Sequence, residues 1–262
     1  TTHEKKSGLH VKEWQNKWQD CSVEIKGDAK AEHAMKFNIY HLLITANPAD
    51  PYANIGAKSL SGEGYKGHVF WDTEIFLLPF YALTQPETAK SLMMYRFNTK
   101  EGARDYAKEG DYKGIRYPWE SADTGHEVTP PWTSDGKIRI WTAEREQHIT
   151  SAVVFGIVYY HTVSGDDQFM IDFGAEILFE TARFWESRLE YNICAERYEL
   201  TEVEGPDEFH ELVNNSVYTN ALTKWSLEQT IVNYKWLKET HPENLKLISE
   251  KIQLEEGEII CW

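Results

Sequence analysis

One short segment of the sequence, residues 204–211, crowds four carboxylates into eight residues and reads Glu-Gly-Pro-Asp-Glu-Phe-His-Glu. Gly205 and Pro206 are incompatible with a regular helix, so the segment is predicted to form an irregular turn. Neighbouring like charges raise the pKa of a carboxyl group by disfavouring its ionisation. A carboxylic acid that keeps its proton near neutral pH can donate that proton to a glycosidic oxygen. The alternative is an acidic turn on the surface that is exposed to solvent, but the aromatic and Asn-rich residues on either side favour a functional site.

A second candidate segment, residues 64–74, joins glycines and aromatic residues to the carboxylate of Asp72 at the start of a predicted helix. Asp72 could simply cap that helix, with Trp71 packed against it. It could also accept hydrogen bonds from sugar hydroxyls while Trp71 packs on the apolar face of a sugar ring. The sequence leaves these two interpretations equal.

Two further segments repeat the combination of aromatic and acidic residues. Residues 117–127 carry Trp119 and Glu120 within a long loop. Because a buried lone carboxylate is costly unless it is hydrogen-bonded, such a loop is either hydrated or a binding surface. Residues 141–148 contain Glu146, Gln147 and His148 near the start of a predicted helix, where part of the acidic charge would compensate the helix dipole.

The elements that must position these segments are predicted to be helices. Apolar spacing and capping signals predict helices over residues 29–46, 72–83, 86–94, 143–163, 166–185, 218–239 and 242–252. Three long polar and aromatic segments lie between them, namely residues 48–69, 111–142 and 190–217, and the third includes a short strand at 198–203. Loops of this length usually carry function. Helix pairs that alternate with such loops favour an all-α toroid with the loops gathered at one mouth.

The composition is that of a globular protein and argues against several function classes. Among 262 residues, 41% are hydrophobic and 13% aromatic, which is enough for a sizeable core. The formal net charge of −15 argues against nucleic acid as a partner. The polar start of the chain predicts no signal peptide, and no apolar run approaches the ~20 residues that span a membrane. Three scattered cysteines suggest no disulfide framework and no metal site, so we expect a cytoplasmic, metal-free protein.

Taken together, the motifs resemble family 65 of the glycoside hydrolases, the family of maltose, trehalose, kojibiose and nigerose phosphorylases. The matching segments appear in the family's order and are residues 67–74, 117–122, 146–149 and 205–211. Residues 180–185 and 218–220 also look like the family. The resemblance begins near Trp14 and continues to the end, so it covers nearly the whole chain.

The resemblance implies an (α/α)6 barrel, which six helix hairpins close, and this chain has too few predicted hairpins for a complete one. We therefore expect residues 1–28 to be a linker region preceding the barrel and residues 29–262 to be a C-terminally truncated barrel. Family members are normally far longer, with a β-sandwich before the barrel and phosphate-binding residues in its late segments. A partial barrel would expose apolar helix faces, so partner chains, a homodimer among them, or aggregation are expected.

The resemblance also implies an inverting mechanism in which Glu208 is the general acid. The residues expected to bind substrate are Trp71, Asp72, Trp119, Glu120, His68, Gln147, His148 and His210. In the phosphorylases of the family, inorganic phosphate attacks the anomeric carbon from the opposite face and yields β-glucose 1-phosphate. The expected partners are thus a disaccharide or short α-glucan and phosphate as co-substrate, with no cofactor.

Two alternatives remain open. A hydrolase of the trehalose type would need a second carboxylate, about 6.5–9.5 Å from the acid, to activate water. An inactive glucan-binding fragment would keep the motifs without turnover. The choice of glycosidic linkage depends on loops on the acceptor side, and residues 117–130 only faintly favour the kojibiose-like branch.

Overall fold

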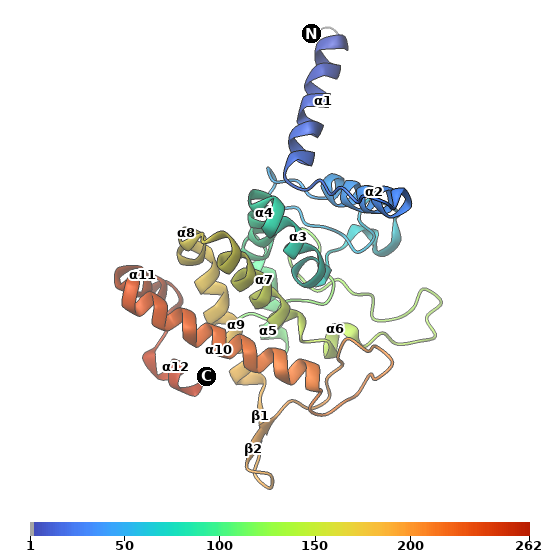
Figure 1. Ribbon diagram of the computed structural model, residues 1–262. Coiled ribbons are helices and arrows are strands. Elements are labelled where there is room, and N and C mark those ends of the chain that lie inside the picture. The colour runs from blue at the N-terminus through green and yellow to red at the C-terminus, as the bar shows by residue number, and fades with distance from the viewer. Residues whose placement is uncertain (1–2) are drawn as a thin grey trace.

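The computed structural model describes residues 3–262, and helices make up most of it (Figure 1). The α-helices are α1 (His3–Gln19), α2 (Ala29–Thr45), α3 (Leu78–Thr84), α4 (Pro86–Asn98), α5 (Lys100–Glu109), α6 (Thr142–Arg145), α7 (Ile149–Ser164), α8 (Asp167–Phe169), α9 (Ala175–Arg188), α10 (Val217–Thr240), α11 (Pro242–Ile252) and α12 (Glu256–Cys261). Two single π-turns, η2 (Thr73–Leu77) and η3 (Met170–Gly174), precede α3 and α9, and a 3₁₀ turn, η1, covers Gly64–Gly67. Among these described helices, none is long and apolar enough to cross a bilayer.

Helix α7 lies at the centre of the packing. It contacts α3, α4, α9 and α10, and it carries fully buried residues such as Val153 and Ile157 on several sides. A helix that is apolar around most of its circumference must be surrounded by other elements, because only then is that surface removed from water. The predicted all-α fold is confirmed, and helices that follow each other in the sequence pack together, as α3 does with α4 and α10 with α11.

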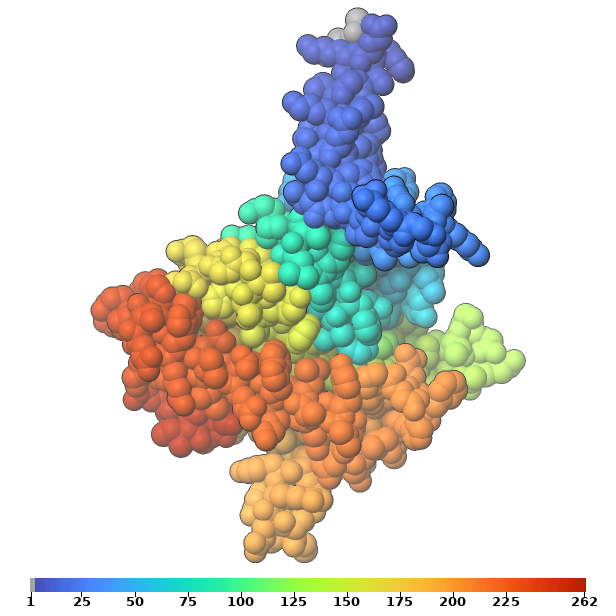
Figure 2. Space-filling model, viewed as in Figure 1, coloured from blue at the N-terminus to red at the C-terminus, as the bar shows by residue number. Residues whose placement is uncertain are grey.

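The three segments predicted to be long loops contain no regular helix longer than a single turn. The second and the third, residues 111–142 and 190–217, lie on the same side of the molecule as α6 (Figure 1). Within the third, the predicted strand at 198–203 is shorter than expected. β2 (Arg197–Glu199) pairs antiparallel with β1 (Glu190–Asn192), and Val203 forms only an isolated bridge with Val213. This small hairpin protrudes from the body (Figure 2).

The helix predicted over residues 143–163 is wrong in one respect, because it is broken at residues 146–148. α6 ends at Arg145 and α7 begins at Ile149. The physical reason is a competing hydrogen bond: the carbonyl of Arg145 accepts from the backbone N–H of Glu204 at 3.0 Å, instead of from the next helical turn. The break therefore ties the acidic segment to the start of α7.

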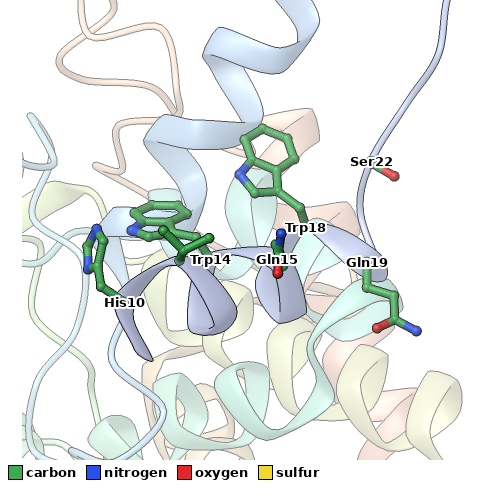
Figure 3. A pocket seen from close by; sticks show the side chains of 7 residues that line it. His10, Trp14, Gln15, Trp18, Gln19 and Ser22 are labelled. Carbon is green, nitrogen blue, oxygen red and sulfur yellow. The ribbon is translucent and has the colours of Figure 1, made fainter. Parts of the chain in front are cut away.

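Three helices, α1, α5 and the short α12, were not predicted. α5 is mostly polar and buries only small residues, Gly102, Ala103 and Ala107, so it lacks the large apolar residues that reveal a helix. α1 falls within the region predicted to be a linker, and it projects away from the body (Figures 1 and 2). A hollow of about 490 Å³ runs along α1 past Trp14 and Trp18 and contains none of the predicted site residues (Figure 3).

A buried ion pair connects α4 to the turn that begins α3. The Nε atom of Arg96 donates to one carboxylate oxygen of Glu74 at 2.6 Å, and its Nη2 atom donates to the other at 3.1 Å. The same Nη2 atom donates to the carbonyl of Phe70 at 2.8 Å. Both side chains have at most 1% of their surface exposed. The pair thus fixes the backbone on both sides of Trp71 and Asp72.

We predict that Arg96→Met lowers the free energy of unfolding by about 3–5 kcal/mol, because Glu74 would be left as an uncompensated buried charge. Chemical denaturation of the variant measures the loss. The double variant Arg96→Met/Glu74→Leu should recover much of it, and Lys108→Met, at an exposed position on α5, is the control. A single variant as stable as the control would contradict the structural role of the pair.

Candidate active site

A cavity of about 600 Å³ brings together five of the residues predicted to form the site. They are Trp71, Asp72, Trp119, Glu120 and Glu208. They come from three segments that are far apart in the sequence: the turn before α3, the loop that follows α5, and the loop between β2 and α10. The cavity therefore depends on the tertiary structure rather than on any one motif.

Two of these segments are held side by side by a backbone bridge. Val69 and Ser121 exchange hydrogen bonds, with N···O distances of 2.8 and 3.0 Å. Because the strands run antiparallel here, Trp71 lies beyond Val69 while Trp119 precedes Ser121, and the two tryptophan–carboxylate pairs face the same cavity. Phe70 packs edge-on against Trp119 at 5.6 Å and closes the gap between the segments.

The carboxylate of Glu127 shapes the loop that carries Trp119 and Glu120. It accepts hydrogen bonds from the backbone N–H of Trp119 at 2.7 Å and from the N–H and hydroxyl of Thr129. Burial raises the pKa of Glu127, and these hydrogen bonds oppose the shift. Gly125 lets the loop approach the end of α4, because at φ +76 a Cβ atom would lie 2.2 Å from the carbonyl oxygen of Thr99.

Asp72 occupies the N-cap position of the π-turn, but in the described structure its side chain makes no capping hydrogen bond. Asp72 is instead one of the residues that line the cavity. Burial raises its pKa, its own backbone N–H opposes the shift, and the charge of Glu74 adds to it. Of the two interpretations left open by the sequence, this placement favours a role in binding.

His68 lies behind Glu120. Its Nδ1 atom is 2.7 Å from a carboxylate oxygen of Glu120, whose side chain is only 7% exposed. His68 therefore orients Glu120 toward the cavity rather than lining the cavity itself. The imidazole is a positioning partner for a carboxylate that would accept sugar hydroxyls.

Gln147 and His148 are also behind the cavity wall. Gln147 accepts a hydrogen bond from Nε of Arg188 at 2.8 Å and donates to the carbonyl of Glu144, which indicates a structural role. The ring of His148 is fully buried and packs edge-on against Trp71, with ring centroids 4.8 Å apart. Burial lowers the pKa of His148 to about 4, so the ring is neutral at neutral pH.

His210, unlike the other predicted site residues, is both exposed to solvent and away from the cavity. Its side chain is 71% exposed and its Nδ1 atom lies 2.8 Å from Asp207 in the same loop. Neighbouring Phe209 is 97% exposed, so this stretch makes few contacts with the body. The role of His210 in binding stays a prediction.

Two carboxyl groups near Glu208, those of Glu146 and Glu204, received no role from the sequence, although both lie in the motifs it singled out. Glu146 and Glu204 are each only 1% exposed. Burial, followed by the charges of Glu204 and Glu208, raises the pKa of Glu146 to about 10. Burial, followed by the charges of Glu211 and Glu208, raises the pKa of Glu204 to about 7, and Arg145 opposes this shift. The acidic motif itself signalled crowding, but only the broken helix reveals that Glu146 joins the group.

Two cations line the same cavity. Lys58 and Lys66 line it together with Tyr65. Tyr65 and Lys66 both have positive φ angles, 59° and 54°, a conformation that non-glycine residues adopt at a cost and that recurs at functional sites. Among residues 3–262, no three His, Cys, Asp or Glu side chains are grouped as a metal site.

The arrangement combines an acid with a platform for a sugar. Indole faces pack on the apolar C–H face of a pyranose, and the adjacent carboxylates Asp72 and Glu120 can accept its hydroxyl groups. Glu208 reaches the same cavity and can protonate the oxygen of a departing group. The geometry is that of a carbohydrate-active site.

Comparison with known proteins agrees with this geometry. Residues 36–260 match the model of the glycosyl hydrolase family 65 central catalytic domain. The chain therefore belongs to glycoside hydrolase family 65, and its helices form part of an (α/α)6 barrel.

Relatives within the family are much longer than this chain. The chain is 49% identical over 256 residues to a kojibiose phosphorylase of Caldanaerobacter subterraneus subsp. tengcongensis, covering 97% of the chain and 33% of the relative. It is 40% identical to a nigerose phosphorylase of Lachnoclostridium phytofermentans, covering 88% and 31%. A solved structure described as "Putative kojibiose phosphorylase from human microbiome" superimposes with a TM-score of 0.87 at 28% identity, covering 100% and 37%. The chain thus spans about a third of the length of these relatives.

We predict that Glu146→Gln stabilises the protein, and that the gain grows as the pH rises. The folded state keeps a proton on Glu146 that the unfolded chain releases above its ordinary pKa of 4.5, so the wild type loses stability as the pH climbs from there toward about 10. At neutral pH the gain should be on the order of 3 kcal/mol, since each pKa unit is worth ~1.4 kcal/mol.

The measurement is the melting temperature as a function of pH. Glu202→Gln is the matched control because Glu202 is exposed and lies in the same acidic region. A Glu146→Gln variant that tracks the wild type at every pH would show that Glu146 does not hold a proton in the folded state.

Proposed function

We propose that the complete gene product containing this chain catalyses the inverting phosphorolysis of an α-linked glucosyl disaccharide. The products would be β-glucose 1-phosphate and a free sugar. The observation that carries the proposal is the convergence of Glu208 with the two tryptophan–carboxylate pairs in one cavity. Family membership supports it, because the matched relatives are named as phosphorylases of kojibiose, nigerose and trehalose.

In this mechanism the glucosyl unit packs on Trp71 and Trp119, and its hydroxyl groups donate to Asp72 and Glu120. Glu208 donates its proton to the glycosidic oxygen as the C1–O bond breaks. Inorganic phosphate attacks C1 from the opposite face and inverts its configuration. Phosphate is already a charged nucleophile, so the reaction needs no second carboxylate as a base, whereas hydrolysis would.

Phosphate is the co-substrate, and the proposal includes no other cofactor. The acidic protein must attract a dianion against its net charge of −15, which requires a local group of cations. Lys58 and Lys66, which line the cavity, supply positive charge that would attract the co-substrate. They support the proposal without defining the phosphate site.

Kojibiose is the first substrate to test. Three kojibiose phosphorylases are 47–49% identical to the chain, whereas the nigerose phosphorylase is 40% and a trehalose phosphorylase 37% identical.

We also propose a cytoplasmic location, where a charged sugar phosphate is retained for further metabolism, and a homodimer as the assembly to look for.

The decisive prediction is phosphate-dependent turnover. The complete gene product, incubated with kojibiose, nigerose, trehalose and maltose in turn, should form β-glucose 1-phosphate only when phosphate is present, and most rapidly from kojibiose. Enzymatic detection of the sugar phosphate and of glucose measures both products. Glucose released at the same rate without phosphate would show that the protein is a hydrolase rather than a phosphorylase. No release from any of the sugars would indicate a sugar-binding protein without turnover.

We predict that Glu208→Gln lowers kcat by about 10²–10⁴-fold, because general acid catalysis contributes this much to a rate. The glutamine keeps the shape of the side chain, so binding of the disaccharide, measured by calorimetry, should be nearly unchanged. Glu202→Gln serves as the control at an exposed position of the same region. Retention of full turnover by Glu208→Gln would assign the proton donor to another residue.

A further inference from the structure

The loop that carries Glu208 lies on the surface of the protein. Residues 206–212 are all exposed to solvent. The hydrogen bonds inside the loop are local, since the side chain of Asp207 accepts from the backbone N–H of Phe209 at 3.2 Å and lies 2.8 Å from Nδ1 of His210. These bonds shape a turn, but they do not place the turn relative to the cavity. The position of Glu208 must therefore be set at the two ends of the loop.

The two ends of the loop are joined to each other at its base. Val203 and Val213 exchange backbone hydrogen bonds, with N···O distances of 3.0 and 2.8 Å. Next to this pair, the backbone N–H of Glu202 donates to the side chain of Asn214 at 2.9 Å. This short ladder closes the loop but does not fix its direction, because a loop that is held only at its base still moves as a unit.

Arg145, the last residue of α6, binds the loop at both ends. Its carbonyl oxygen accepts from the backbone N–H of Glu204 at 3.0 Å, and its Nη1 atom donates to the carbonyl oxygen of Glu211 at 3.0 Å. Within residues 3–262, no other residue outside the loop makes hydrogen bonds on both sides of Glu208. A hydrogen bond from a guanidinium is charge-assisted and therefore stronger than one between neutral groups.

An aromatic contact holds the guanidinium of Arg145 in place. It lies 3.9 Å from the ring centroid of Trp141, one helical turn earlier in the sequence. The guanidinium of Arg139 lies 4.4 Å from the centroid of the same ring, and Arg139 also pairs with the carboxylate of Glu144. A guanidinium that stacks on an indole keeps its donors in a fixed fork. The side chain of Arg145 is therefore oriented before it binds the carbonyl of Glu211.

The segment that contains Arg145 and Trp141 also forms part of the cavity wall. Ile140 and Thr142, the two neighbours of Trp141 in the sequence, line the cavity together with Glu208. Arg145 itself is not one of the lining residues. Its contacts therefore join the loop of the acid to a segment that already has a fixed place in the cavity.

We propose that Arg145 is a positioning residue that binds both ends of the loop and thereby sets the position of Glu208, so that the acid reaches the glycosidic oxygen. The inference rests on the proposed phosphorolysis, in which Glu208 donates the proton. Arg145 acts through Glu208 and does not touch the substrate. Its substitution should therefore impair proton donation much more than sugar binding.

The first test is kinetic and uses the complete gene product. Arg145→Met should lower kcat for the disaccharide by about 10–100-fold, because a misplacement of ~1 Å can cost a reaction ~10²-fold. KM should change by less than about threefold, since the residues that bind the sugar are untouched. Arg145→Lys keeps a cationic donor for the carbonyl of Glu211, so its kcat should lie between those of Arg145→Met and the wild type. Arg197→Met, which removes an exposed arginine from β2, is the matched control and should leave both constants unchanged.

A substrate that needs little proton donation separates a misplaced acid from general damage to the site. α-Glucosyl fluoride and phosphate would give β-glucose 1-phosphate and fluoride, and fluoride leaves with far less help from an acid than a sugar alkoxide does. Arg145→Met and Glu208→Gln should both keep most of the wild-type kcat with this substrate, although both are impaired with the disaccharide. An equal loss with both substrates, or a kcat of Arg145→Met for the disaccharide that matches the control, would overturn the inference.

The second test does not depend on turnover. Hydrogen–deuterium exchange followed by mass spectrometry reports the local opening of hydrogen-bonded backbone amides. We expect peptides that cover residues 203–213 to exchange faster in Arg145→Met than in the wild type, whereas peptides from α7 should exchange at the wild-type rate. In Arg197→Met both regions should behave as in the wild type. Unchanged exchange of residues 203–213 in Arg145→Met would show that Arg145 does not hold the loop.

These outcomes separate the inference from the proposed function. A wild-type protein that forms no glucose 1-phosphate would refute phosphorolysis, while hydrogen exchange would still report whether Arg145 holds the loop. Conversely, phosphate-dependent turnover that is unchanged in Arg145→Met would support phosphorolysis and refute the inference. If Arg145→Met fails to fold, Arg145→Lys and Trp141→Leu, which removes the ring that orients the guanidinium, replace it in both tests.

Discussion

The buried ion pair between Arg96 and Glu74 is the constraint on which the site depends most. Two charges taken out of water must satisfy each other with good geometry, and here the guanidinium also binds the carbonyl of Phe70. That requirement fixes α4 against the π-turn, and the turn in turn fixes the direction of Trp71 and Asp72. The OH group of Tyr117 donates to the carbonyl of Arg96 at 2.9 Å, so the loop that carries Trp119 and Glu120 is anchored to the same residue. Both halves of the sugar platform are thus tied to one arginine.

Backbone hydrogen bonds that leave regular helices assemble the rest of the site. Val69 pairs with Ser121 rather than with a helical neighbour, and the carbonyl of Arg145 accepts from Glu204. Each of these bonds joins segments that are at least fifty residues apart, and each lies next to a residue that lines the cavity or the carboxyl cluster. The helices supply a rigid body, while these few non-helical contacts determine where the loops meet. An active site built in this way can change its loops without changing its scaffold.

The pKa values of the carboxyl groups in the site depend more on burial than on the net charge of the chain. An acidic chain would be expected to keep its carboxylates apart in water, yet Glu146 and Glu204 are buried within reach of Glu208. Burial and the charges of neighbouring carboxylates raise the pKa values of Glu146 and Glu204, so both buried groups favour their protonated forms. His148, neutral and enclosed by Trp71, Trp119 and Tyr218, separates this cluster from the aromatic platform. The carboxyl cluster and the aromatic sugar platform therefore lie on either side of the His148 ring, and one is acidic whereas the other is aromatic.

The sequence by itself determined most of the helical architecture, the family and five of the residues that line the cavity, because apolar periodicity and short motifs are local properties. The glycine-rich turn before Trp71 and the Gly-Pro turn before Glu208 could be predicted from the sequence for the same reason. Only the tertiary structure decided that Asp72 lines the cavity without capping its helix, that Gln147 binds Arg188, and that His210 points outward. It also decided that the helix breaks at residues 146–148, since the hydrogen bond responsible comes from Glu204, far along the chain. Contacts of that range, and the burial that shifts a pKa, arise only when distant segments pack together.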